Sequence, residues 1–342
     1  MSTVSVIVPT LNRHDLLLEA IASALDQSRA PLEVVVVDDG SAPPADGAAL
    51  QERFGPGLRL LRNMRPEGLA WARQQGVDAA RGDYVVQLDD DDLFAPTLIE
   101  ECAALLDADP ELELVFIGVE GFGQSAAHFN RVHPAGAARV IEQGGGTAWR
   151  DGVVVFGSAL FCGLLKQVPM PFQRVMARRD AWHRVSRLRL AAYQAALELD
   201  SPQAARDRIR GTLRDSEWAL YAALACTKTA LINRPLYLQR CDGQGGSSQT
   251  AMHQRHIHQG IGIRSVLARA STRLPELRAF RQEIATNLAG SHFDAAYAFI
   301  GLGQYAEALR HLGQNFRLRP NLKAAKLLLK LGATWAVPKR TC

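Results

Sequence analysis

Four consecutive aspartates, Asp89 to Asp92, are the residues of this sequence that point most directly to chemistry. They follow the apolar segment YVVQL and precede LFAP, where the next helix is expected to begin. A run of like charges is commonly a solvated surface segment. This one is confined between two buried segments, where a divalent cation that prefers oxygen ligands would neutralise it. The run predicts a Mg²⁺ or Mn²⁺ site shared with substrate phosphates, with an N-cap or surface cluster as the alternative.

Two further polar segments follow short apolar segments in the same way. Residues 9–12 (PTLN) come directly after VSVIV, and residues 38–41 (DDGS) come directly after EVVVV. In open α/β sheets, ligands bind beyond the carboxyl ends of the strands. If the apolar segments are parallel strands, all three polar segments meet at one edge of the sheet. Their convergence predicts a ligand site there more strongly than any single motif does.

The elements that must carry these loops alternate between short apolar segments, as in strands, and segments with apolar residues at helical spacing. Short apolar segments rich in β-branched residues are typical of strands buried on both faces. Such strands are expected at 4–8, 33–37, 58–61, 84–88 and in ELELVFIG (111–118), and helices near 16–25, 46–54, 67–81 and 97–107. Strands separated by helical crossovers predict an α/β fold: a mainly parallel, Rossmann-like sheet with helices on both faces.

The second half of the sequence gives weaker signals. An arginine-rich segment at 174–214 is either a solvated helical face or a surface for an anionic acceptor or membrane headgroups. The segment GQGGSSQ after Asp242 indicates a boundary. Beyond it, FDAAYAFIGLGQYAEALRHLGQNFRLRP resembles one helix-turn-helix repeat of the tetratricopeptide kind, which needs neighbouring helices to bury its apolar face. We therefore expect a C-terminal α-helical appendage that is structural, with peptide binding as the alternative.

The composition limits the class of protein. A chain of 342 residues suggests two domains, and a net charge of +4 is too small to argue for a nucleic-acid partner. No apolar run reaches the ~20 residues of a membrane-spanning helix. The five cysteines lie far apart without a C-x-x-C pair, which argues against a disulfide framework or a zinc site. These observations predict a cytoplasmic protein.

Four motifs follow one another between residues 3 and 120: VSVIVPTLNR, VVVVDDGS, EGLAWARQQGVDAARGDYVVQLDDDD and the helix after it. This order resembles the nucleotide-binding half of family 2 glycosyltransferases, which have the GT-A fold. The resemblance implies an inverting, metal-assisted transferase, hexosyltransferase-like, that moves a sugar from a UDP- or GDP-sugar donor to a saccharide or lipid-linked acceptor in cell-surface polysaccharide synthesis. It implies a nucleotide-sugar-binding half at 1–120, an acceptor-binding and catalytic half at 121–248, and a helical region at 249–342.

The donor residues are carried over from the matching motifs. By resemblance, Asp39 pairs with the nucleotide base, Pro9 and Thr10 line the base site, and Arg73 lies on the base or phosphate side. The alternatives are that Asp39 is a turn aspartate capping its own loop and that Arg73 is an exposed helix residue.

The metal residues follow from the D-x-D pattern. Asp89 and Asp91 match its two ends, with Asp91 as the metal ligand and Asp90 near the ribose. Relatives often place a histidine two residues after the arginine that corresponds to Arg240. This sequence has Asp242 there, which could still approach the metal or the diphosphate.

The catalytic base is expected in the segment DSEWAL. This segment resembles the family motif E-D-W-x-L, with Glu217 at the second acidic position and Ser216 at the first, so Asp215 is the other candidate. An inverting transfer needs a carboxylate that takes the proton of the acceptor hydroxyl. The alternative for Glu217 is a helix-surface glutamate.

Two other functions are weighed against transfer. Nucleotidyltransferases carry a glycine-rich basic loop after the first strand, which PTLNRHD does not resemble. The second alternative is a non-catalytic sugar-nucleotide-binding or scaffold protein whose helical tail binds a partner, and the altered DSE motif favours it. Peripheral association with the inner face of the membrane and homo-oligomer formation stay open.

Overall fold

The structure is a computed structural model that describes residues 1–209, 215–242 and 249–336, with the backbone alone at 215, 249–259, 330 and 332–336. The chain divides into two units. Unit 1 comprises Met1–Gln194 and Leu199–Gly245, and unit 2 comprises Ala195–Glu198 and Gly246–Cys342. Each unit is described by itself below.

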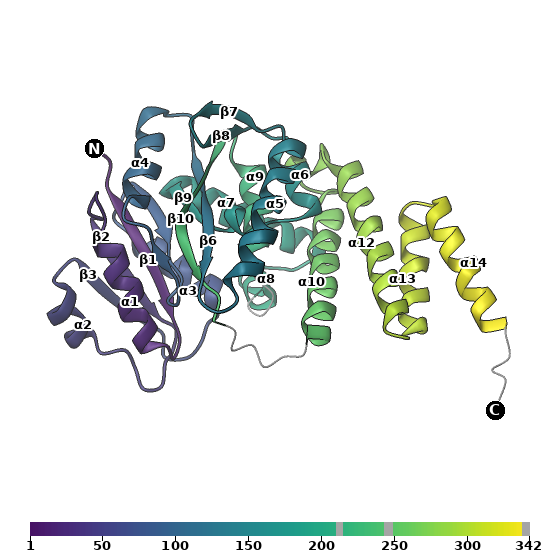
Figure 1. Ribbon diagram of the computed structural model, residues 1–342, viewed down its shortest axis with the longest axis horizontal. Helices are drawn as coiled ribbons and strands as arrows, with labels where there is room; N and C mark the ends of the chain where they lie inside the picture. Colours follow the sequence, from purple (N-terminus) through teal and green to yellow (C-terminus); the bar gives the residue numbers. More distant parts are fainter. Residues whose placement is uncertain (210–214, 243–248, 337–342) are drawn as a thin grey trace. The chain divides into compact units, whose positions relative to one another are not determined.

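Unit 1 is built on a ten-stranded sheet (Figure 1). Its strands are β1 (Val4–Thr10), β2 (Glu33–Asp38), β3 (Leu58–Arg62), β4 (Tyr84–Gln87), β5 (Leu93–Phe94), β6 (Leu114–Phe122), β7 (Thr147–Arg150), β8 (Val153–Phe156), β9 (Val175–Arg178) and β10 (Thr229–Arg240). Their order is β3-β2-β1-β4-β9-β6-β10-β8-β7, and β5 pairs with β10 outside this path. Because β9 is antiparallel to both β4 and β6, strands β1, β2, β3, β4, β6 and β10 run in one direction. The predicted mainly parallel sheet is confirmed.

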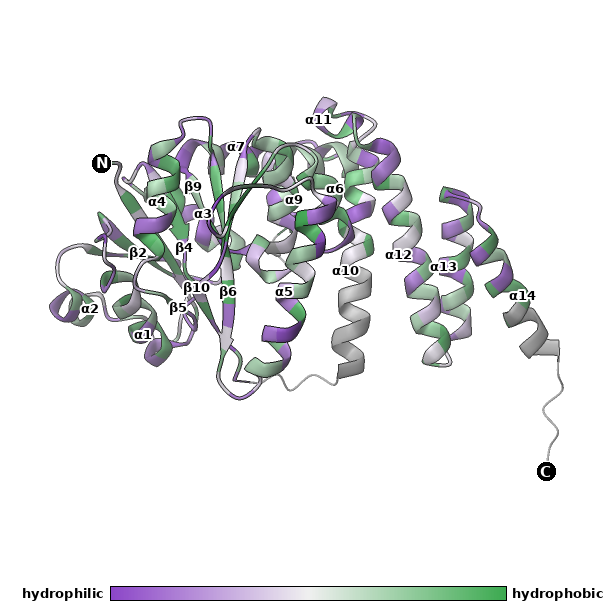
Figure 2. Cartoon of the chain, turned by 45° about the horizontal axis from the view of Figure 1, so that its top comes forward, coloured by the Kyte–Doolittle hydropathy of each residue, from purple (hydrophilic) through white to green (hydrophobic). Residues whose placement is uncertain are grey.

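Helices cover both faces of this sheet. They are α1 (His14–Leu25), α2 (Gly47–Phe54), α3 (Leu69–Ala79), α4 (Leu98–Ala108), α5 (Ala126–Gln143), α6 (Leu160–Lys166), the 3₁₀ helix η1 (Met170–Gln173), α7 (Arg179–Leu197), α8 (Pro202–Ile209) and α9 (Asp215–Ala225). Val4, Val6 and Val8 of β1 share one core with α1, α2 and α4. The intervening Ile7 faces α3 on the opposite side. Successive side chains of a strand alternate between the two faces, so β1 needs apolar residues throughout. In Figure 2 the green apolar residues accordingly gather on the strands.

Helix α3 approaches the sheet at Gly76. A Cβ atom placed there would overlap Cγ2 of Ile7 and lie 3.2 Å from Cγ2 of Val37. The lack of a side chain at Gly76 therefore sets how closely α3 packs against β1 and β2.

The substitution Gly76→Ala is expected to lower the free energy of unfolding of unit 1 by about 1–3 kcal/mol, because an overpacked core must shift its backbone. Chemical denaturation followed by circular dichroism measures this loss. Gly290→Ala is the matched control, since no atom lies within 4 Å of a Cβ placed at that helical glycine. It should raise the stability slightly through better helix propensity. Equal effects of the two substitutions would contradict the close packing of α3.

Unit 2 is helical in the part that the structure describes. Its helices are α10 (Gln249–Ala270), α11 (Pro275–Arg278), α12 (Arg281–Gly301), α13 (Tyr305–Leu318) and α14 (Leu322–Ala336). Helices α12 and α13 form a helix-turn-helix with Gly303 in the turn at φ +71°, and they share an apolar core with α14. The predicted helical C-terminal region is confirmed, whereas its relation to tetratricopeptide repeats stays a prediction.

No helix among the described residues combines the length and the apolar character that crossing a membrane requires.

Candidate functional site

One cavity lies at the carboxyl ends of β1, β2 and β4. This strand-end cavity is open to solvent and is lined by Pro9, Thr10, Leu11, Arg13, Asp39, Pro66, Gly68, Leu69, Ala72 and Asp90. The loops after β1, β2 and β4 thus meet in space. Of the residues assigned to the donor, the cavity contains Pro9, Thr10, Asp39 and Asp90.

Asp39 anchors the loop that closes one side of this cavity. Its Oδ1 accepts hydrogen bonds from Asn63 Nδ2 and from the backbone N–H of Glu67, and its Oδ2 accepts one from the N–H of Gly68, each at 2.8 Å. The neighbouring Asp38 caps the turn after β2 instead, because its Oδ1 accepts from the N–H of Ser41. The alternative role of capping its own loop therefore applies to Asp38 and not to Asp39.

Asp89 is the first of the four aspartates and is held by two guanidinium groups. Arg73 of α3 forms an ion pair with Oδ1, and Arg174 lies 3.1 Å from Oδ2. Burial alone would raise the pKa of Asp89, but the two arginines outweigh it and lower this pKa to about 2. Arg73 is only 5% exposed, so the alternative of an exposed helix residue is wrong. The predicted solvated face likewise does not apply to Arg174 and Arg189, which are buried.

Asp90 and Asp91 share one arginine. Nη1 of Arg13, at the start of α1, lies 3.1 Å from Asp90 Oδ1 and 2.6 Å from Asp91 Oδ2. Asp90 also accepts a hydrogen bond of 2.7 Å from the hydroxyl of Thr10. The side chain of Asp91 is 33% exposed, against 7% for Asp90. Asp91 is the most accessible carboxylate of the four.

Asp92, to which the sequence assigned no separate role, holds the end of β10. It accepts hydrogen bonds from the Tyr237 hydroxyl at 3.0 Å and from the backbone N–H of Arg240 at 2.8 Å. Burial raises the pKa of Asp92 to about 7, although the Arg174 guanidinium opposes this rise. Asp92 therefore ties the four aspartates to the segment that leads to Asp242.

Asp242 lies near this site through Arg240. Nε of Arg240 donates to the backbone oxygen of Asp91 at 3.0 Å, and its Nη1 is 3.6 Å from Asp242 Oδ2. The other oxygen of Asp242 accepts from the backbone N–H of Gln124 at 3.0 Å. Its side chain is 41% exposed.

The donor atoms at this edge fit one mode of metal binding. Within the described residues, no three His, Cys, Asp or Glu side chains are grouped closely enough to enclose a metal. Mg²⁺ and similar ions are commonly bound by one or two carboxylates together with substrate phosphates. The accessible carboxylate of Asp91 fits binding of a metal that is shared with substrate phosphates, whereas Asp89 is held by two arginines.

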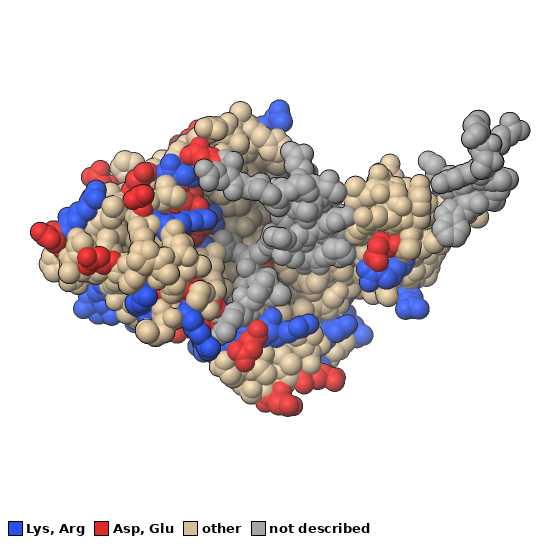
Figure 3. Space-filling view, turned by 90° about the horizontal axis from the view of Figure 1, so that it is seen from below, with Lys and Arg blue, Asp and Glu red and all other residues tan. Residues whose placement is uncertain are grey.

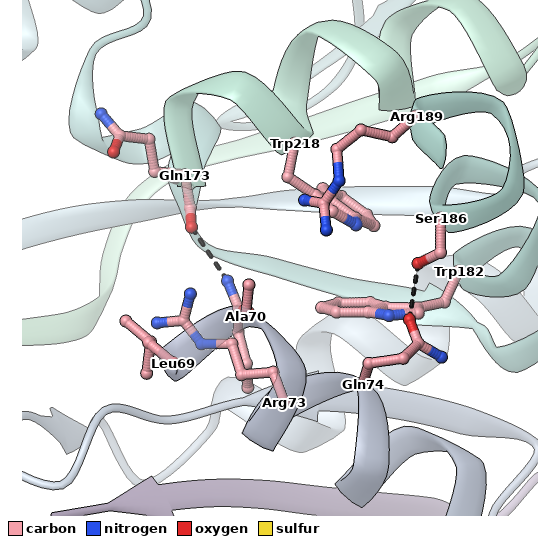
Figure 4. Close-up of a pocket in the computed structure, with 10 residues that line it drawn as sticks. Leu69, Ala70, Arg73, Gln74, Gln173, Trp182, Ser186, Arg189 and Trp218 are labelled. Carbon is pink, nitrogen blue, oxygen red and sulfur yellow. Dashed lines mark hydrogen bonds between the residues drawn. The ribbon is translucent and has the colours of Figure 1, made fainter. Parts of the chain in front are cut away.

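A second cavity shares the lining residue Leu69 with the first. Figure 4 shows the residues that line this second cavity. This tryptophan cavity is lined by Leu69, Ala70, Arg73, Gln74, Gln87, Gln173, Trp182, Ser186, Arg189 and Trp218. The rings of Trp182 and Trp218 have centroids 4.4 Å apart, and Ser186 donates a hydrogen bond of 2.6 Å to Gln74. Arg73 lines this cavity and pairs with Asp89, and Leu69 lines both cavities.

Glu217 lies beside this cavity but does not line it. Its carboxyl group is fully buried and accepts a hydrogen bond of 2.7 Å from the hydroxyl of Tyr193. Burial raises the pKa of Glu217, while the charge of Arg189 opposes this rise. The alternative of a helix-surface glutamate is therefore wrong. Asp215 begins α9, but its side chain lies outside the described part of the structure.

Charged side chains of both signs are interspersed on unit 1 in the view from below (Figure 3). At the site itself, the guanidinium groups of Arg13, Arg73 and Arg174 pair with the four aspartates. The site therefore presents groups that can meet an anion as well as groups that can meet a cation.

Comparison with known proteins finds similarity to one family. Residues 5–166 match the family model Glycosyl transferase family 2. The chain is 39% identical over 107 residues to the succinoglycan biosynthesis protein ExoO of Rhizobium meliloti, which is 31% of this chain and 30% of that protein. The matches span 37% or less of the length of the first curated relatives.

Two solved structures share the fold. The structure of residues 1–349 of TarS from S. aureus covers 93% of this chain and 81% of its own, with a TM-score of 0.55 and 18% identity. The mannosyltransferase PcManGT from Pyrobaculum calidifontis, solved with GDP-Man and Mn2+, covers 98% of this chain and 81% of its own, with a TM-score of 0.51 and 20% identity. The predicted GT-A fold is confirmed.

Proposed function

We propose that this chain is a sugar-nucleotide-dependent glycosyltransferase that moves a sugar from a UDP- or GDP-linked donor to a saccharide or lipid-linked acceptor. The observation that carries the proposal is the strand-end cavity, where the loops after three parallel strands bring Thr10, Asp39 and Asp90 together. Next to this cavity, Arg73 pairs with Asp89, the first of the four aspartates.

Relatives with named ligands or pathways support the choice of substrates. TarS was solved with UDP-GlcNAc, PcManGT with GDP-Man and Mn2+, and ExoO is named for succinoglycan biosynthesis. By analogy, this chain would use a UDP- or GDP-sugar in polysaccharide synthesis. We assign residues 1–120 to the donor, 121–248 to the acceptor and the chemistry, and 249–342 to a helical region. Association with a membrane surface and oligomer formation stay predictions.

The donor would occupy the strand-end cavity with its base near Asp39 and its ribose near Asp90. Asp91 would hold a divalent cation, with Asp89 and Asp242 nearby. Such a cation, when bound, stabilises the negative charge that develops on the departing diphosphate. The buried guanidinium groups of Arg73 and Arg174 are fixed in place by Asp89, and preorganised cations of this kind can stabilise the same charge.

The acceptor hydroxyl must lose a proton while it attacks the donor sugar from the face opposite the diphosphate. This direct attack from the opposite face gives inversion. A carboxylate of the 215–217 segment, either Glu217 or Asp215, would take the proton. Burial raises the pKa of Glu217, which is the direction that suits a general base working near neutral pH.

A non-catalytic sugar-nucleotide-binding protein is the second candidate. Two observations favour it: Ser216 replaces the first acidic residue of the family motif, and the carboxylate of Glu217 does not line the cavity. Binding of a nucleotide sugar with neither hydrolysis nor transfer would support this candidate.

A thermal-shift screen of UDP, GDP and their sugars, with and without Mn²⁺, tests the proposed function. A ligand at 100 times its Kd should stabilise the protein by about 2.7 kcal/mol. The shift should require Mn²⁺ and should be specific for one nucleotide. Absence of any shift would contradict the proposal.

The substitution Asp39→Ala is expected to weaken nucleotide binding at least roughly tenfold, because the loop 63–68 loses the side chain that anchors it, at about 1 kcal/mol per lost hydrogen bond. Isothermal titration with the nucleotide found in the screen measures this change. Asp46→Ala is the control, since Asp46 caps α2 through the N–H groups of Ala48 and Ala49 and lines neither the strand-end cavity nor the tryptophan cavity. Unchanged affinity in Asp39→Ala would remove Asp39 from the donor site.

A further inference from the structure

The four aspartates form one tight turn. The backbone N–H of Asp92 donates to the backbone oxygen of Asp89 at 3.1 Å, which closes the turn. Asp90 and Asp91 are its two central residues, and they are the residues proposed to meet the donor ribose and the cation. The shape of the turn therefore determines where these two carboxylates lie.

One hydroxyl group joins the first and the last residue of this turn. The hydroxyl of Tyr237 accepts a hydrogen bond of 3.0 Å from the backbone N–H of Asp89 and donates one of 3.0 Å to Asp92 Oδ2. A phenolic hydroxyl can accept and donate at the same time, so both bonds can form together. Tyr237 thus holds both ends of the turn that presents Asp90 and Asp91.

Tyr237 is itself fixed by its surroundings. Its side chain is fully buried. The guanidinium of Arg174 lies 4.7 Å from the centre of its ring, and the ring of Phe94 meets it edge-on with the centroids 5.8 Å apart. Its backbone is paired on both sides, with Phe94 of β5 and Val119 of β6. A side chain held in this way gives precise support to a ligand site.

Loss of this hydroxyl would affect both ends of the turn. The N–H of Asp89 would lose the acceptor that Tyr237 provides. Asp92 Oδ2 would lose its bond of 3.0 Å and keep the longer contact of 3.4 Å with Arg174 Nη2. A shielded polar group that loses its partner is costly, so the turn should rearrange to satisfy these groups. Its two central residues would move with it.

We propose that Tyr237 is a positioning residue for the divalent cation: its hydroxyl fixes the turn so that Asp91 can meet the cation together with the donor diphosphate. This inference rests on the proposed function, because it needs a cation that is shared with a nucleotide diphosphate. Replacing residues that orient metal ligands from behind commonly changes metal affinity by about 10–100-fold.

Tyr84 offers a matched control in the same sheet. It is buried as well, its hydroxyl donates a hydrogen bond of 2.9 Å to Asp107 Oδ1, and the guanidinium of Arg178 lies 5.4 Å from the centre of its ring. Tyr84 is the first residue of β4, whereas the four aspartates follow the other end of that strand. Removal of its hydroxyl therefore deletes similar contacts away from the site.

The test compares Tyr237→Phe and Tyr84→Phe with the wild type, each as the purified full chain. Mn²⁺ is titrated at a fixed concentration of UDP or GDP, whichever the thermal-shift screen selects. Calorimetry and the electron paramagnetic resonance signal of free Mn²⁺ follow binding. Tyr237→Phe should raise the Mn²⁺ concentration for half-maximal nucleotide binding roughly tenfold or more, and saturating Mn²⁺ should restore binding. Tyr84→Phe should leave this concentration unchanged, although both variants should lower the midpoint of chemical denaturation.

Hydrogen exchange on the protein without metal or nucleotide tests the support of the turn directly. A peptide that spans residues 88–93 should exchange faster in Tyr237→Phe than in the wild type, because the N–H of Asp89 loses its acceptor. The same peptide should exchange at the wild-type rate in Tyr84→Phe.

Asp92→Asn replaces Tyr237→Phe if that variant does not fold. The two oxygens of Asp92 accept from the Tyr237 hydroxyl and from the N–H of Arg240. An amide has one oxygen and cannot accept both bonds in the same way. The same increase in the Mn²⁺ requirement is therefore expected.

An unchanged Mn²⁺ requirement in Tyr237→Phe, an equal increase in Tyr84→Phe, or unchanged exchange of the 88–93 peptide would overturn the inference and leave the proposed function standing. Absence of Mn²⁺-dependent nucleotide binding in the wild type would instead contradict the proposed function, and the inference with it.

Discussion

Replacing Asp91 with asparagine is expected to remove the manganese-dependent part of nucleotide-sugar binding and to slow transfer roughly a thousandfold, about 4 kcal/mol of barrier. Asp91 is the most accessible of the four aspartates, and its carboxylate is shared with no arginine other than Arg13 among the described residues. An amide of the same shape keeps one oxygen but loses the charge that a hard cation requires. Titration of the nucleotide sugar with and without Mn²⁺, followed by a transfer assay, measures both effects.

Asp151→Asn is the matched control for this prediction. Asp151 is an exposed aspartate between β7 and β8, and it lines neither the strand-end cavity nor the tryptophan cavity. It should leave both binding and transfer unchanged. If Mn²⁺ strengthens nucleotide-sugar binding by the Asp91→Asn variant as much as it does in the wild type, Asp91 is not the metal ligand.

Glu217→Gln is expected to lower transfer by roughly 10²–10⁴-fold while donor binding stays intact, because glutamine has the same shape but takes up no proton. Rapid-quench or coupled assays at saturating donor measure the rate, and titration measures donor affinity. Asp215→Asn is made in parallel. If Glu217→Gln retains its turnover and Asp215→Asn loses it, the role of base belongs to Asp215.

Stability against pH shows independently that the Glu217→Gln variant folds. Burial raises the pKa of Glu217 above the value of 4.5 that it has in an unfolded chain. Above pH 4.5 the unfolded chain releases this proton while the folded protein keeps it, so folding loses stability as the pH rises through the folded pKa. The glutamine variant lacks this loss, and its free energy of unfolding should fall less with rising pH than that of the wild type.

The sequence predicts the donor half of the site because its signals are local. The strands that end at Thr10 and at Asp38 contain runs of apolar, β-branched residues and are buried at every position, which is the pattern of strands buried on both faces. Once these strands are parallel, their polar ends must meet at one edge, as Asp39 and Asp90 do. The loop order is therefore enough to place these residues together.

The partners of the aspartates could not be predicted in the same way. Arg174 reaches Asp89 and Asp92 because β9 inserts antiparallel between β4 and β6. That pairing joins segments nearly ninety residues apart, and no local period encodes it. The burial of Glu217 has the same origin, since Tyr193 of α7 contacts α9 from a distant part of the sequence. The role of Asp92 could not be predicted from the sequence either, because it depends on a hydrogen bond from the end of β10.

The close packing of α3 against β1 and β2 at Gly76 limits where substrate preference can change. This helix borders the strand-end cavity and the tryptophan cavity at once, and a Cβ atom at Gly76 would overlap Ile7 of β1. A change of shape in either cavity should therefore come from the residues that face α3 and not from a shift of α3 itself. Homologues with other substrates should keep a small residue at the position of Gly76.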